Sequence, residues 1–132
     1  LAGVAASLGS VLVLALFLRL DHTQYVTLLP KSVTTAISMD VAAELGGIAA
    51  LTGALVILTG IVGALLADTV FRVFGITEPI AKGIGIGSAA HAVGTAKALQ
   101  MGEVEGAMSG LAIAVAGVLT AVLCPVFVNL ID

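Results

Sequence analysis

The stretch LLPKSVTTAISMDVAAELGG, residues 28–47, decides how the fold is read, because it places polar and charged side chains between long apolar runs. It contains a proline, a lysine, several hydroxyl side chains and two acids, and it ends on two glycines. The uncharged runs at 1–18 and 45–67 have about the length of a membrane-crossing helix, roughly 18 residues or more. The stretch therefore predicts an interrupted, polar helix within a membrane bundle.

The composition is that of a membrane protein. Of 132 residues, 60% are apolar and only 10% are charged, with a mean hydropathy of +1.24, whereas soluble domains have about 25% charged residues. The net charge is −3 and the cations are scattered, which excludes a nucleic-acid surface. The sequence lacks a nucleophile, paired-acid or metal-ligand constellation, so we expect no enzyme activity, cofactor or metal.

Three uncharged runs predict membrane spans, at about 1–18, 45–67 and 106–131. Two further segments, at about 30–44 and 79–101, are helical in character but are interrupted by polar groups or glycines. Each begins with a proline and a lysine, continues with hydroxyls, and leads through a glycine break into an apolar span. We therefore expect a single all-α membrane domain, a multi-span bundle with two broken or re-entrant helices in a weak internal repeat.

The first polar segment predicts an anion site. On a helix over 30–44, four polar side chains fall within an arc of about 100°. They are Lys31, Thr34, Thr35 and Ser38. Ser32 is a suitable N-cap, and the free N–H groups of the first helical turn attract negative charge. The alternative is equally weighted: Lys31 extends to the membrane interface, and the hydroxyls bond to carbonyls of the preceding turn.

Two acids, Asp40 and Glu44, lie one turn apart on the opposite side of this helix. Inside lipid at least one of them would be protonated or paired, which would suit coupling to protons or sodium ions. The other interpretation places this end of the helix at the water interface, where two acids cost little. We favour the interface, because Gly46 and Gly47 follow at once.

The second polar segment predicts a stripe made by Ser88, His91 and Thr95, which fall within about 60° on a helix, with Lys97 on the far side. An ionisable side chain inside a membrane segment indicates a functional site. We therefore assign His91 to ligand binding or to carrying a proton. The alternative is a neutral histidine satisfied by a neighbouring carbonyl or hydroxyl.

Small residues indicate close helix packing. Gly60 and Gly63 lie on the middle span, and Gly106 and Gly110 form a GxxxG motif on the last one. The alternating glycines at 83, 85 and 87 lack the spacing of a dinucleotide or P-loop motif, so no nucleotide site is expected.

Four blocks carry a family resemblance: LPKSVTT at 29–35, PIAKG at 79–83, SAAHAVGTAKAL at 88–99 and EGAMSGLA at 105–112. In combination they resemble the LrgB/CidB family of bacterial inner-membrane proteins, over most of the chain. The resemblance implies the C-terminal part of a longer, multi-spanning protein of the bacterial inner (plasma) membrane.

The family's properties give two functional expectations. One is an antiholin-like regulator of murein hydrolase activity and cell lysis, which acts with a holin-like partner of the LrgA/CidA type. The other is transport, because family members have been tied to small carboxylates such as pyruvate, and the related plant chloroplast protein is similar to a glycolate/glycerate translocator.

We take a carrier of small carboxylates (pyruvate, lactate, glycolate or similar) as the main hypothesis, since polar groups inside lipid are costly and a regulator would not need them. The antiholin-like regulator is the alternative. A homo-oligomer in the lipid bilayer is also expected. The resemblance and the helical geometry together assign the pocket to Lys31, Ser32, Thr34, Thr35, Ser88, His91 and Thr95.

Overall fold

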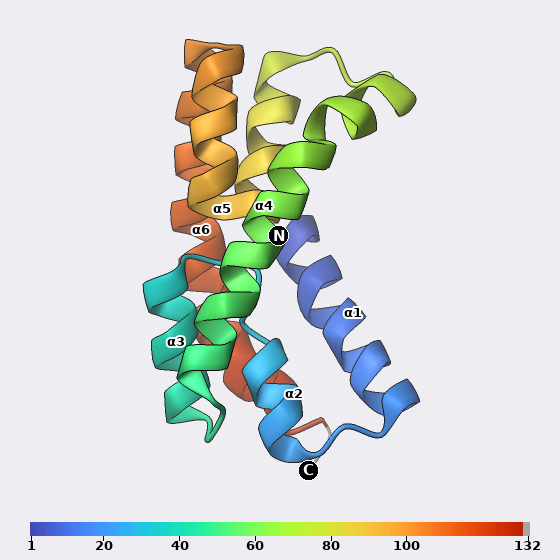
Figure 1. Ribbon diagram of the computed structural model, residues 1–132, viewed down its shortest axis with the longest axis vertical. Coiled ribbons are helices and arrows are strands. Elements are labelled where there is room, and N and C mark those ends of the chain that lie inside the picture. Colours follow the sequence, from blue (N-terminus) through green and yellow to red (C-terminus); the bar gives the residue numbers. More distant parts are fainter. Residues whose placement is uncertain (131–132) are drawn as a thin grey trace.

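A computed structural model describes residues 1–130, and every regular element in that part of the chain is an α-helix (Figure 1). The helices are α1 (Ala2–Leu18), α2 (His22–Leu28), α3 (Thr35–Glu44), α4 (Ala49–Val73), α5 (Pro79–Met101) and α6 (Glu103–Val128). The expected all-α chain is confirmed.

The two long helices, α4 and α6, are long and apolar enough to cross a membrane. Their outer faces carry large apolar side chains that are open to the surroundings: Leu65 is 75% exposed, Val118 67% and Val122 65%. A core helix of a soluble protein would bury such side chains. The exposure therefore favours lipid as the medium around α4 and α6.

The observed helices differ from the predicted spans at their ends. α1 has 17 residues, slightly short of a full crossing. α4 starts after the glycine break and continues past Asp68, where the uncharged run ended, because a single Asp is compatible with a helix. The Asp68 carboxylate forms a 2.6 Å ion pair with Nζ of Lys97. α6 starts at Glu103, earlier than expected, and contains Pro125 in its last turn. The predicted end of this span, at 131, lies outside the described residues.

The first broken element is a hairpin made of α2 and α3. Asp21 and Gln24 form a capping box that starts α2, and the chain reverses direction over residues 29–34. The start of α2 therefore lies beside the end of α3: Nε2 of His22 is 3.0 Å from the carbonyl oxygen of Leu45. Pro30 favours this reversal because it lacks an N–H to continue a helix.

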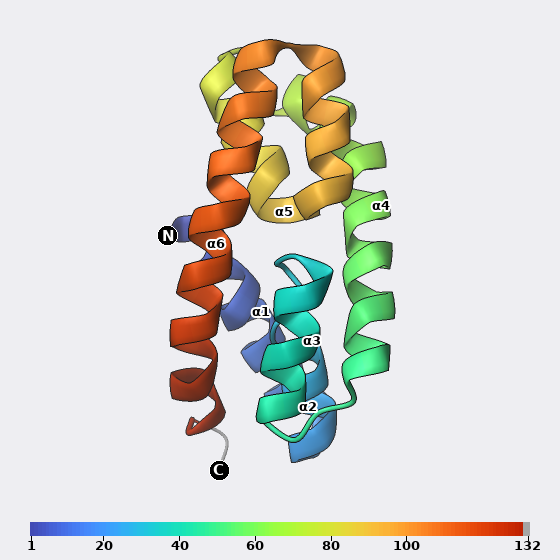
Figure 2. The same cartoon turned by 90° about the vertical axis from the view of Figure 1, so that its left-hand side faces the viewer.

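The second broken element is α5, which folds back on itself at His91. This residue has φ 46° and ψ −133°, outside helical geometry. A Cβ added to Gly94 would lie 2.6 Å from Cγ2 of Ile86, although eight residues span about 12 Å along a straight helix. Residues 79–90 and 92–101 therefore form two antiparallel halves, which Figure 2 shows as a U-shaped element.

The two hairpins occupy opposite halves of the molecule. In Figures 1 and 2, α2 and α3 lie in the lower half, α5 lies in the upper half, and α4 and α6 run past both. Each half has its own buried cluster: Leu8, Tyr25 and Leu29 belong to the lower one, and Phe71 and Ile86 to the upper one. The hairpin tips consequently face each other near the middle.

Candidate functional site

The two hairpin tips enclose a small cavity of about 30 Å³. The first hairpin contributes Thr34 and Thr35, and the turn of α5 contributes His91. The remaining lining is apolar and comes from α4 and from the residues beside His91: Val56, Ile57, Ala90, Ala92 and Val93. Side chains from both sequence-predicted polar segments thus meet at one place.

His91 is the central polar group of this cavity. The residue is 2% exposed, and neither Nδ1 nor Nε2 has a hydrogen-bond partner within residues 1–130. The alternative of a histidine satisfied by a neighbouring carbonyl or hydroxyl is therefore wrong. A buried polar group without a partner costs about 1–3 kcal/mol, which a ligand with a suitable acceptor or donor would offset.

The first hairpin presents a helix start to the cavity. α3 begins at Thr35, with Thr34 as its N-cap in an extended conformation (φ −61°, ψ 146°), and no side chain caps it. The predicted helix over 30–44 with Ser32 as its N-cap is thus wrong at its beginning. The chain makes a turn after Pro30, in which the Lys31 amide donates to the carbonyl of Leu28 at 3.2 Å.

Lys31 and Ser32 lie in this turn. Nζ of Lys31 donates to Oγ of Ser32 at 3.1 Å, and Oγ of Ser7 in α1 donates to the same oxygen at 2.5 Å. Lys31 and Ser32 are half-buried, and neither of them lines the cavity between the hairpin tips. The sequence reasoning missed Ser7, whose only signal is a hydroxyl in an otherwise apolar run.

The other polar residues of α3 do not reach the cavity. Ser38 is fully buried and donates to the carbonyl of Pro30 at 2.6 Å, so it holds the turn together. Asp40 and Glu44 are exposed on the part of α3 that leads away from the tip. Their exposure agrees with the interface interpretation, and ion coupling through them stays a prediction.

The predicted stripe of Ser88, His91 and Thr95 does not exist, because the chain reverses at His91. Thr95 lies beyond the turn; its Oγ1 donates to the His91 carbonyl at 3.0 Å and lies 2.7 Å from Oγ of Ser109 in α6. The hydrogen bonds of Thr95 therefore stabilise the turn and connect it to α6. Ser109 is buried, and the sequence reasoning did not identify it as a site residue.

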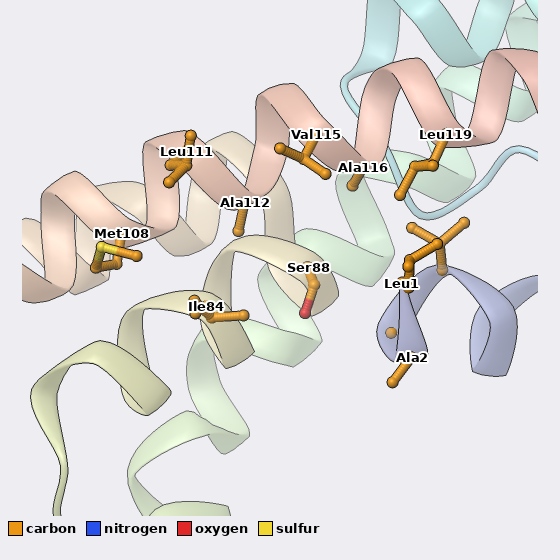
Figure 3. Close-up of a pocket in the computed structure, with 12 residues that line it drawn as sticks. Leu1, Ala2, Ile84, Ser88, Met108, Leu111, Ala112, Val115, Ala116 and Leu119 are labelled. Atoms are coloured by element: carbon orange, nitrogen blue, oxygen red, sulfur yellow. The ribbon is translucent and has the colours of Figure 1, made fainter.

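Ser88 points into a different space. It donates to the Gly85 carbonyl at 3.2 Å and lines a cavity of about 310 Å³ among the start of α1, α5 and α6 (Figure 3). The rest of that lining is apolar, with Ile84, Leu111 and Val115 among its members. Ser88 and His91 are therefore not brought together.

Three of the four packing glycines lie against α5. A Cβ added to Gly60 would be 3.2 Å from the Ala90 carbonyl, and one added to Gly63 would be 2.7 Å from Cβ of Ala90. Gly106 faces Leu99, where a Cβ has no room. Gly110 has no neighbour within 4 Å in the described chain, so its role in packing stays a prediction.

Long apolar helices with exposed outer faces, combined with two hairpins whose tips share a small cavity, define the chain as an all-α protein of the membrane type. Comparison with known proteins makes this more specific. The chain belongs to the LrgB-like family, whose model matches residues 1–130.

Relatives that carry the name antiholin-like protein LrgB match nearly the whole chain. The Bacillus subtilis (strain 168) protein is 38% identical over 131 residues, which is 99% of this chain and 57% of the relative. The Bacillus mycoides (strain KBAB4) protein is 37% identical over 129 residues, 98% of this chain and 56% of the relative. The chain thus spans little more than half the length of these relatives, and no solved structure matches it.

Proposed function

We propose that this chain is part of an antiholin-like membrane protein that restrains a holin-like partner and so limits murein hydrolase activity and lysis. The observation that carries this proposal is family membership together with the name shared by the Bacillus relatives. The exposed apolar faces of α4 and α6 offer surface for lipid or for the helices of a partner.

Gly110 allows a direct test of this function. A Cβ at this position would have no neighbour within 4 Å in the described chain, so we expect Gly110→Ile to preserve the packing within the chain but to obstruct a partner helix. Gly9 in α1 also has no neighbour within 4 Å, and Gly9→Ile is the matched control. We expect cells that carry Gly110→Ile to lyse earlier than cells with the wild type or the control. Equal lysis in all three strains would count against regulation through this face.

The geometry favours a second function, the carriage of small carboxylates through a site between the hairpin tips. The observation that carries it is the buried His91 ring, whose two nitrogens lack a hydrogen-bond partner within residues 1–130 and which lines one cavity with Thr34 and Thr35. A carboxylate would accept hydrogen bonds from an imidazole N–H, from the threonine hydroxyls and from the amides at the start of α3. Lys31 does not line the closed cavity, and it would supply the opposite charge once the hairpins separate.

The size of the cavity makes movement of the tips a requirement of the carrier function. A volume of about 30 Å³ holds one or two water molecules, which is room for a carboxylate head but not for the body of pyruvate or lactate. A substrate would enter only when the hairpins separate. In a bilayer each hairpin would be re-entrant, entering and leaving on one side, and the two would approach from opposite sides, as in carriers with inverted repeats.

Uptake by proteoliposomes tests the carrier. The whole protein is reconstituted and supplied with labelled pyruvate, lactate, glycolate or acetate, and Lys31→Met is compared with Arg19→Met, which removes an exposed cation at the end of α1. We expect saturable uptake that falls at least tenfold in Lys31→Met only, because the site loses a charged hydrogen bond of about 1.5–3 kcal/mol. Absence of uptake for every acid, with or without a pH gradient, would leave the antiholin-like function alone.

A further inference from the structure

Two neighbouring cavities lie at the end of the molecule where α4 ends and α5 begins, at the top of Figure 1. One is polar, has a volume of about 430 Å³ and includes Arg72, Thr77 and Lys82 in its lining. The other is apolar, with about 320 Å³. Phe71 and Ile76 line both, so the two cavities are adjacent, and neither includes a residue of the cavity between the hairpin tips.

The polar cavity has an excess of positive charge. Asp68 is the acid in its lining, and this carboxylate is already engaged by Nζ of Lys97 at 2.6 Å. Within residues 1–130, no carboxylate lies within ion-pair distance of Arg72 or Lys82. Arg72 and Lys82, beside the Thr77 hydroxyl, are therefore available to bind a negatively charged group. Phosphate is a group that arginine binds well.

The apolar cavity is a groove between α4 and the first half of α5. Small side chains form its floor, at Ala67, Gly85 and Ala81, and Leu66 and Val70 line it from α4 with half-exposed side chains. A Cβ added to Gly85 would be in ordinary van der Waals contact with the Phe71 ring, at 3.6 Å, so these two residues lie against each other in the groove. Its shape and composition suit an alkyl chain.

The expected depth of the two cavities in a bilayer agrees with the polar lining of one and the apolar lining of the other. Arg72 is in the last turn of α4, an apolar helix of 25 residues that is long enough to cross a membrane. The end of such a helix lies at the level of the lipid headgroups, and the groove below it lies at the level of the acyl chains.

We propose that this double cavity binds an anionic phospholipid, with the phosphate between Arg72 and Lys82 and one acyl chain in the groove beside Phe71. A soluble phosphate would use the cations but would leave the groove empty. A zwitterionic lipid would fill the groove but lacks the net charge that the two cations select.

The test is lipid retention by the whole purified protein, measured by native mass spectrometry after exchange into phosphatidylglycerol or phosphatidylcholine. We expect phosphatidylglycerol to be retained preferentially. The double variant Arg72→Gln with Lys82→Gln should lose about 25-fold in affinity, since each cation near the membrane surface contributes roughly fivefold. Arg19→Gln, which removes an exposed cation at the end of α1, should retain lipid like the wild type.

A second pair of variants tests the groove. Ala81→Phe fills it without changing any charge, and Ala107→Phe adds the same ring at an exposed position of α6 that lines none of these cavities. Retention should fall in Ala81→Phe only, and millimolar inorganic phosphate should not displace the lipid. Equal retention by the wild type and the double variant, an equal loss in Arg19→Gln, displacement by phosphate, or no effect of Ala81→Phe would each overturn the proposal.

Discussion

The backbone of His91 gives a sharp prediction about the turn that creates the site. At φ 46° and ψ −133° an L-residue is strained, at about 1–3 kcal/mol, whereas glycine adopts positive φ freely. His91→Gly and His91→Ala both remove the ring, so their difference isolates the backbone. Glycine loses more entropy on folding, about 0.5–1 kcal/mol, and the net expectation is that His91→Gly is more stable than His91→Ala by about 1 kcal/mol.

The assay is denaturant unfolding of the whole purified protein in one detergent, with both variants measured side by side. Ala107→Gly is the control, because at this exposed position inside α6 glycine should instead destabilise by about 0.5–1 kcal/mol. The sign of the glycine effect should therefore reverse between residues 91 and 107. Equal stability of the two His91 variants, or a more stable His91→Ala, would refute the turn as described.

Two further predictions concern packing and a buried hydrogen bond, and both are measured as shifts in the midpoint of thermal unfolding. Gly87→Ala should destabilise the protein by about 1–3 kcal/mol, because its Cβ would lie 2.8 Å from Cα of Ser109. The control, Gly110→Ala, has free space around its Cβ and should be neutral or slightly stabilising. Similar losses of stability in both variants would contradict the α5–α6 packing. Tyr25→Phe should cost about 1 kcal/mol because Oη donates to the Phe127 carbonyl at 3.0 Å, and an unchanged midpoint would show that this bond contributes nothing.

The interruptions of the chain were readable from sequence, because they depend on local chemistry. The breaks at Gly46 and Gly47 and at Gly102 lie where helices end in the structure. Pro79 was expected to open a helix and occupies its first turn. The grouping of polar residues was also informative: Thr34 and Thr35 were assigned to one pocket with His91, and they line one cavity with it.

A broken or re-entrant helix was expected over 79–101, but the position of the reversal in α5 was not readable, because no proline or glycine occupies the turn at His91. Local propensities across Ala90, His91 and Ala92 describe a continuous helix, and a stripe through Ser88 follows from that assumption. The turn arises from packing: Gly94 lets the two halves of α5 approach each other, and Gly87 lets the first half approach α6. Such contacts join residues that are distant along the chain, so the periodicity of polar and apolar residues in the sequence does not predict them.

The most direct test of the carboxylate site between the hairpin tips, on which the second proposed function depends, is a distance measurement by solid-state NMR. The whole protein, with ¹⁵N-labelled histidine rings, is placed in membranes with pyruvate labelled at its carboxyl carbon. The account predicts dipolar coupling to a ring nitrogen of His91 at about 3.5–4 Å, the separation across a hydrogen bond of ordinary length, and no coupling to His22. Saturating pyruvate without any coupling at His91 would contradict it.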